Sequence, residues 1–115
     1  MKLLLVEDSM ARAMALADAL EREGLEVALA PTAGEAARRL IRFRPDALVL
    51  NASIPARGAS ELLRFARAEC PRLRVVLIHA RDDDGDKFAE FTPDAVFDSV
   101  APQEIVAALR RLLAA

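Results

Sequence analysis

The sequence is poor in the residues that most often indicate a disulfide framework, a cysteine metal site or a nucleic-acid surface. Its 115 residues include one cysteine, five phenylalanines and no tryptophan or tyrosine. The single cysteine, Cys70, excludes an internal disulfide and a Cys-x-x-Cys metal site. With few aromatic residues and a net charge of −2, the chain has neither a stacking surface for bases nor a basic face for phosphates. We therefore expect no nucleic-acid binding.

The chain also lacks long apolar runs. None approaches the roughly 20 residues that span a bilayer. The first residues, MKLLLVED, reach acidic side chains after a run of apolar residues that is too short for the core of a signal peptide. We expect no membrane association and a cytoplasmic location. No linker or low-complexity segment divides the sequence, so residues 1–115 are expected to form one domain.

Short apolar runs alternate with longer amphipathic segments along the chain. The continuous character of these runs is typical of strands buried on both faces of a sheet. They predict strands at 3–6, 25–30, 47–50, 73–78 and 95–97. Helical spacing and helix-start residues predict helices after Ser9, after Thr32, over 60–68, over 83–91 and from Pro102 onward.

Two of these helices carry clear start signals. Ser9 is a good N-cap. The residues after it that recur at helical spacing are Met10, Ala13, Met14, Ala17 and Leu20. Thr32 is predicted to cap the second helix, and Glu35, three residues later, would complete a capping box.

This order of elements predicts an α/β fold with five βα units in one doubly wound parallel sheet, covered by helices on both faces. In such open sheets, sites lie at the carboxyl ends of the strands. The residues at those ends are Glu7–Asp8, Asn51, His79 and the region of Asp98–Ser99. We expect them to converge on one shallow pocket.

The chain resembles the receiver domain of bacterial two-component response regulators over essentially its whole length. The segments that carry the resemblance are LLLVEDS, GLEVALAPTAGEAARRL and RPDALVLNASIPARGASELL. The resemblance implies the flavodoxin-like strand order 2-1-3-4-5. The resemblance also implies the site of typical members. There, an acidic pair and an aspartate hold Mg²⁺, and that aspartate accepts a phosphoryl group from a histidine kinase. A threonine or serine and a lysine contact the phosphoryl oxygens.

The match at the first and third strands is close, except at the phospho-acceptor position. Glu7 and Asp8 match the acidic pair of the family, and Pro55 matches the proline four residues after the phospho-acceptor. Asn51 stands at the phospho-acceptor position itself. An amide is neither anionic nor usefully nucleophilic at neutral pH, so Asn51 keeps the shape of an aspartate and loses the nucleophile.

The match at the fourth and fifth strands shows further departures. His79 falls at the threonine or serine position, and Ser99 falls at about the lysine position. No lysine occurs after Lys87. The aromatic residue usually found three residues before the lysine corresponds to Val96. Three of four chemical roles are lost together, which a natural pseudo-receiver explains better than a single laboratory substitution does. We expect no enzymatic activity.

The remaining polar residues allow two interpretations. A weak divalent-cation site could persist at Glu7, Asp8 and Ser53, since Mg²⁺ binds oxygen ligands. With the third carboxylate gone, we favour acids that are solvated or hydrogen-bonded to the Ser9 turn, and we expect no resident cofactor. His79 is expected to face these acids and Asn51 and to fill the phosphoryl volume. Without the lysine, two carboxylates would otherwise lack a cationic partner.

These substitutions predict a phosphorylation-independent signalling or scaffolding module that acts through a protein partner, which the sequence does not identify. By resemblance, a homodimer could form through the fourth helix, fifth strand and fifth helix. Two alternatives stay open: a phosphotransfer receiver inactivated by an Asp-to-Asn substitution at position 51, and a small-ligand sensor using the former phosphorylation pocket. The last helix is expected to end where a complete receiver would, and the sequence leaves open whether an output domain follows Ala115.

Overall fold

The strands form one parallel sheet. The computed structural model describes residues 1–80, 87–98 and 101–114. Its strands pair in the order β2-β1-β3-β4-β5, and all four pairings are parallel. The strands are β1 (Lys2–Val6), β2 (Glu26–Ala30), β3 (Ala47–Asn51), β4 (Arg74–Ile78) and β5 (Ala95–Val96). This order confirms the predicted flavodoxin-like α/β fold.

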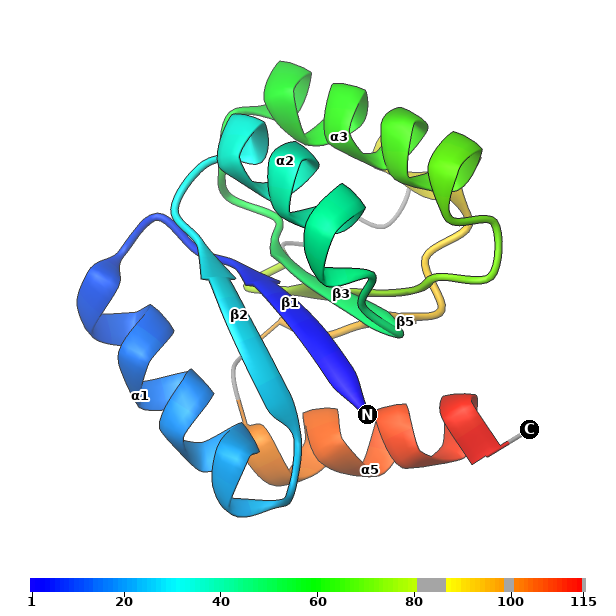
Figure 1. Ribbon diagram of the computed structural model, residues 1–115. Coiled ribbons are helices and arrows are strands. Elements are labelled where there is room, and N and C mark those ends of the chain that lie inside the picture. The colour runs from blue at the N-terminus through cyan, green and yellow to red at the C-terminus, as the bar shows by residue number, and fades with distance from the viewer. Residues whose placement is uncertain (81–86, 99–100, 115) are drawn as a thin grey trace.

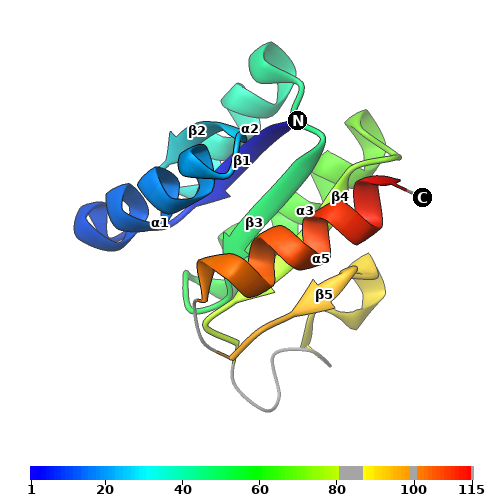
Figure 2. The ribbon, with the colours of Figure 1, turned by 90° about the horizontal axis from the view of Figure 1, so that it is seen from below.

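Helices cover both faces of the sheet. The α-helices of the described residues are α1 (Met10–Arg22), α2 (Ala33–Phe43), α3 (Ala56–Glu69) and α5 (Pro102–Ala114). Figures 1 and 2 show α2 and α3 together on one face and α1 and α5 on the other. None of the described helices is long and apolar enough to span a membrane.

Two hydrophobic cores explain why the strands read as continuous apolar runs. Along β1, Leu4 and Val6 pack into the core under α2 and α3, whereas Leu3 and Leu5 pack into the core under α1 and α5. All four side chains are fully buried. Because successive strand residues point to opposite faces, a strand covered on both sides needs an apolar residue at every position.

The predicted helix starts are confirmed in outline. The Ser9 hydroxyl accepts a hydrogen bond from the Arg12 backbone N–H at 3.3 Å, and the Thr32 hydroxyl accepts one from the Glu35 N–H at 3.1 Å. The capping box at Thr32 is only half formed, because the Glu35 carboxylate pairs with Arg38 at 2.9 Å.

The predicted apolar face of α1 was partly wrong. Met10 and Met14 are 64% and 54% exposed. The buried residues of this helix are Ala13, Leu16, Ala17 and Leu20. Leu16 was missed because Met10 and Met14 fit the helical spacing of the alanines on that face equally well.

Other boundaries also differ from the prediction. Helix α3 begins at Ala56 rather than at residue 60, because Pro55 already has a φ of −51° at the N-cap position and can lead directly into a helix. The strand predicted at 95–97 ends at Val96. Of the helix predicted over 83–91, residues 83–86 lie outside the described part of the chain. The described remainder holds a single 3₁₀ turn, η1 (Ala89–Phe91).

Candidate functional site

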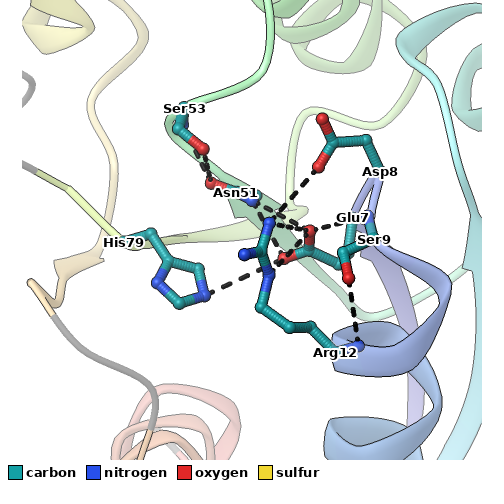
Figure 3. Close-up of polar contacts among 7 residues, drawn as sticks. All are labelled: Glu7, Asp8, Ser9, Arg12, Asn51, Ser53 and His79. Atoms are coloured by element: carbon teal, nitrogen blue, oxygen red, sulfur yellow. Dashed lines mark hydrogen bonds and ion pairs between the residues drawn. The ribbon is translucent and has the colours of Figure 1, made fainter.

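The polar residues that follow β1, β3 and β4 meet at one edge of the sheet. In the register, Val6 lies beside Leu50 and Asn51 lies beside Ile78. Asn51 therefore ends β3 between the residues that follow the two neighbouring strands, which are Glu7 and His79. Figure 3 shows these side chains pointing toward one another, as predicted.

Asn51 and Glu7 form the centre of this cluster. The Asn51 amide nitrogen donates to both carboxylate oxygens of Glu7, at 3.0 Å to Oε1 and 2.9 Å to Oε2. The Asn51 carbonyl oxygen accepts from the Ser53 backbone N–H at 2.9 Å and from its hydroxyl at 2.7 Å. These partners fix the orientation of the amide, because only its nitrogen can donate to a carboxylate. Asn51 is fully buried, and Glu7 is 3% exposed.

Three further donors hold Glu7 in its ionised form. Its Oε1 accepts from the Ser9 backbone N–H at 3.0 Å and from Nε and Nη2 of Arg12 at 3.4 and 3.1 Å. Burial by itself would raise the pKa of the Glu7 carboxyl. Hydrogen bonds from Ser9, Arg12 and Asn51 act in the opposite direction and lower this pKa below its ordinary value. The expected hydrogen bond between the acids and the Ser9 turn is confirmed for Glu7.

Arg12 corrects the expectation that the two acids lack a cationic partner. Its guanidinium lies 3.1 Å from Glu7 and 3.6 Å from Asp8. Asp8 itself is exposed, with 55% of its side chain accessible. The available signal was the spacing of Asp8 and Arg12, four residues apart across a helix start, where opposite charges face each other. Sequence reasoning missed it.

His79 faces Glu7 but does not bond to it. Its Nε2 lies 3.9 Å from Glu7 Oε2, which is beyond hydrogen-bond distance. The atom is buried and has no hydrogen-bond partner among the described residues. The backbone of His79 is left-handed, with a φ of 53°. Non-glycine residues seldom adopt this conformation, and His is among those that do so more often.

As placed, the residues do not fit the Mg²⁺ that the resemblance implies. Mg²⁺ requires oxygen ligands in near-octahedral geometry. Here an amide nitrogen and a guanidinium face the Glu7 carboxylate, and the Ser53 hydroxyl donates to Asn51. Within the described residues, no three His, Cys, Asp or Glu side chains are grouped to hold a metal. Ser99, also predicted for this pocket, lies outside them.

The comparisons with known proteins agree with this architecture. The sequence profile described as the response regulator receiver domain matches residues 3–110. The chain is 33% identical over 113 residues to the probable transcriptional regulatory protein TcrX of Mycobacterium tuberculosis, covering 96% of this chain and 48% of that protein. It is 33% identical over 118 residues to the response regulator MprA of Mycobacterium leprae, covering 98% and 51%. The chain thus spans about half the length of these relatives.

Solved structures show the same fold. A CheY-like receiver domain protein from Methanospirillum hungatei superposes with a TM-score of 0.87 at 23% identity, covering 98% of this chain and 93% of that one. A putative response regulator from Chloroflexus aurantiacus gives 0.86 at 24% identity, with 99% and 98% covered. Together with the profile match over nearly the whole sequence, the fold and the strand-end cluster show that the chain belongs to the response regulator receiver domain family of signal-transduction modules.

Proposed function

We propose that this receiver domain transmits or scaffolds a signal through protein–protein contact without phosphorylation at position 51, and that it is not an enzyme. The observation that carries this proposal is the pair of hydrogen bonds from the Asn51 amide to Glu7. The residue at the phospho-acceptor position is not a nucleophile, and its amide nitrogen donates to a buried carboxylate.

The charges of the cluster support the same proposal. Phosphoryl transfer to a carboxylate requires cations that gather the charge of the transferring group. At this site the cation is Arg12, which pairs with Glu7 and Asp8. A guanidinium bound to the acidic pair competes with a divalent cation for the same oxygens. We infer that Arg12 neutralises part of the charge of the acidic pair without a bound metal.

The proposed working surface is a protein-binding face. The face formed by β5 and α5 is a candidate for a partner or a second copy, by analogy with the family. Val96, at the position of the family's usual aromatic, is 44% exposed. A small aliphatic residue there cannot swing between buried and exposed rotamers as a large aromatic does. We expect this face to stay in one arrangement.

Exposure to a small phosphodonor tests the proposal. The protein is incubated with acetyl phosphate and Mg²⁺, and its intact mass is measured alongside the Asn51→Asp variant. We expect no adduct on the parent protein and at most slow, partial labelling of Asn51→Asp, because the lysine and the hydroxyl are also missing. A stoichiometric, hydroxylamine-labile adduct on the parent protein would overturn the proposal. Rapid and complete labelling of Asn51→Asp would instead favour the inactivated-receiver alternative.

A further inference from the structure

A cavity of about 220 Å³ opens beside the polar cluster, on the side of the sheet covered by α1 and α5. Its polar lining comes from Glu7, Arg12 and His79, and its apolar lining comes from Ala15, Leu16, Ile78 and Pro102. Asn51 and Asp8 do not line it, so it is distinct from the space in front of the phospho-acceptor position. An apolar cavity with a few converging polar groups is the usual form of a small-molecule site.

Two residues that line this cavity each carry a polar atom with unused hydrogen-bonding capacity among the described residues. Among the described residues, Glu7 Oε1 accepts from Ser9, Arg12 and Asn51, whereas Oε2 accepts one hydrogen bond, from Asn51. His79 Nε2 is buried and unpartnered among the described residues. The two atoms lie 3.9 Å apart. At a single atom about 2.8 Å from each, the angle between the directions to these two atoms would be roughly a right angle. One amino or hydroxyl group can satisfy this geometry.

The formal charge of the cluster favours an amino group over a hydroxyl group. Glu7 and Asp8 contribute two negative charges and Arg12 contributes one positive charge, which leaves one negative charge uncompensated among these three residues. A cationic group at Glu7 Oε2 would balance it in a largely buried place, where opposite charges attract more strongly than in water. A primary ammonium also has three donors, so it can bond both Oε2 and a neutral imidazole Nε2.

We propose that this cavity binds a primary aliphatic amine, with the ammonium bridging Glu7 and His79 and the alkyl chain lying along Ala15, Leu16 and Ile78. Amine binding would give a receiver that is not phosphorylated a chemical input at the same strand ends. The amine site itself does not depend on whether position 51 is phosphorylated. The amine could be a free small molecule or a lysine side chain of a partner, since both carry the same head group.

Titration with matched ligands followed in the amide NMR spectrum tests this binding. The probes are n-butylamine, n-butanol and Nα-acetyl-lysine amide, used at about pH 8, where alkylamines are charged. We expect n-butylamine to give saturable shifts at Ala15, Leu16 and Ile78 with low-millimolar affinity, and n-butanol to bind at least about tenfold more weakly. Comparable binding of the lysine derivative points to a partner's lysine, and its failure to bind points to a free amine.

Two alanines on the same helix provide the matched variants. Ala15 is exposed and lines the cavity, whereas Ala11 is exposed and does not. Ala15→Phe should lower the affinity for n-butylamine at least about tenfold, and Ala11→Phe should leave it within about twofold. If Ala15→Phe does not fold, Ala15→Leu replaces it. Absence of saturable shifts with n-butylamine, equal binding of n-butanol, or equal loss in both variants would overturn the proposal.

Discussion

The side-chain amide of Asn51 donates to both carboxylate oxygens of Glu7, at 3.0 and 2.9 Å, in a place where both side chains are buried. An ionised aspartate could not make either bond, because a carboxylate only accepts hydrogen bonds. It would also bring a second negative charge against a buried one. The amide at position 51 is therefore the residue that suits Glu7 when no metal lies between them.

Asn51→Asp should destabilise the fold in the absence of divalent cations. Replacing two hydrogen bonds to a charged group by a contact between two buried carboxylates is expected to cost about 2–4 kcal/mol at neutral pH. Mg²⁺ should restore part of this loss, because the cation would bridge the two acids. Urea denaturation with and without Mg²⁺ measures both effects.

Ser53→Ala is the control for this substitution. It removes the hydroxyl donor to Asn51 and leaves the contact with Glu7 in place. It should cost about 1 kcal/mol and show no response to Mg²⁺. An Asn51→Asp variant as stable as the parent protein in the absence of Mg²⁺ would contradict the role assigned to the amide.

The lowered pKa of Glu7 predicts a specific pH dependence of stability. Because the folded state lowers this pKa below its ordinary value of 4.5, the unfolded chain binds the proton more readily. The stabilising contribution of Glu7 is therefore fully present above that value and is lost as the pH falls through the lower folded pKa. Comparing the parent protein with Glu7→Gln from neutral to acidic pH isolates the stabilising contribution of the Glu7 carboxylate. The difference in unfolding free energy should be largest at neutral pH and shrink on acidification, and a constant difference would show that Glu7 titrates normally.

Arg12 should compete with Mg²⁺ for the acidic pair. We expect the parent protein to show no saturable Mg²⁺ shifts at low millimolar concentration in NMR, and Arg12→Ala to bind Mg²⁺ more tightly. Removing a half-exposed guanidinium should also cost about 1 kcal/mol of stability. Arg38→Ala serves as the control, since Arg38 pairs with Glu35 on the distant helix α2. Saturable binding by the parent protein would mean that the remaining acids suffice for a metal.

Much of the fold could be predicted because a strand that is buried on both faces has apolar residues at successive positions. The central strands, β1, β3 and β4, are covered on both sides, so their apolar runs are unbroken. The start of α3 was harder to place, because Pro55 makes no side-chain capping bond and gives a weaker signal than Ser9 or Thr32. On α1, alanines at many positions left the spacing compatible with more than one buried face.

The convergence of Glu7, Asn51 and His79 could likewise be predicted, because the ends of neighbouring parallel strands meet at one edge of the sheet. The cationic partner of the acids, Arg12, could not be predicted. A long arginine side chain on an exposed turn can adopt many rotamers, and pairs spaced four residues apart are common on helices without structural consequence. The left-handed backbone of His79 was also invisible in the sequence, since no glycine or asparagine marks that position.

That backbone conformation gives a prediction of its own. At a φ of 53° the Cβ atom of a non-glycine residue is crowded, which costs about 1–2 kcal/mol relative to glycine. His79→Gly and His79→Ala both remove the imidazole, so they differ mainly in this strain. His79→Gly should therefore be the more stable of the two by about 1 kcal/mol in urea denaturation.

Position 11 supplies the opposite expectation within the same protein. Ala11 is exposed inside α1, where glycine loses more conformational freedom than alanine does on folding. Ala11→Gly should be less stable than the parent protein by about 1 kcal/mol, which reverses the order expected at position 79. If alanine were also favoured over glycine at position 79, the left-handed turn could not be what directs the imidazole over Glu7. The contacts of the ring itself would then have to hold it there.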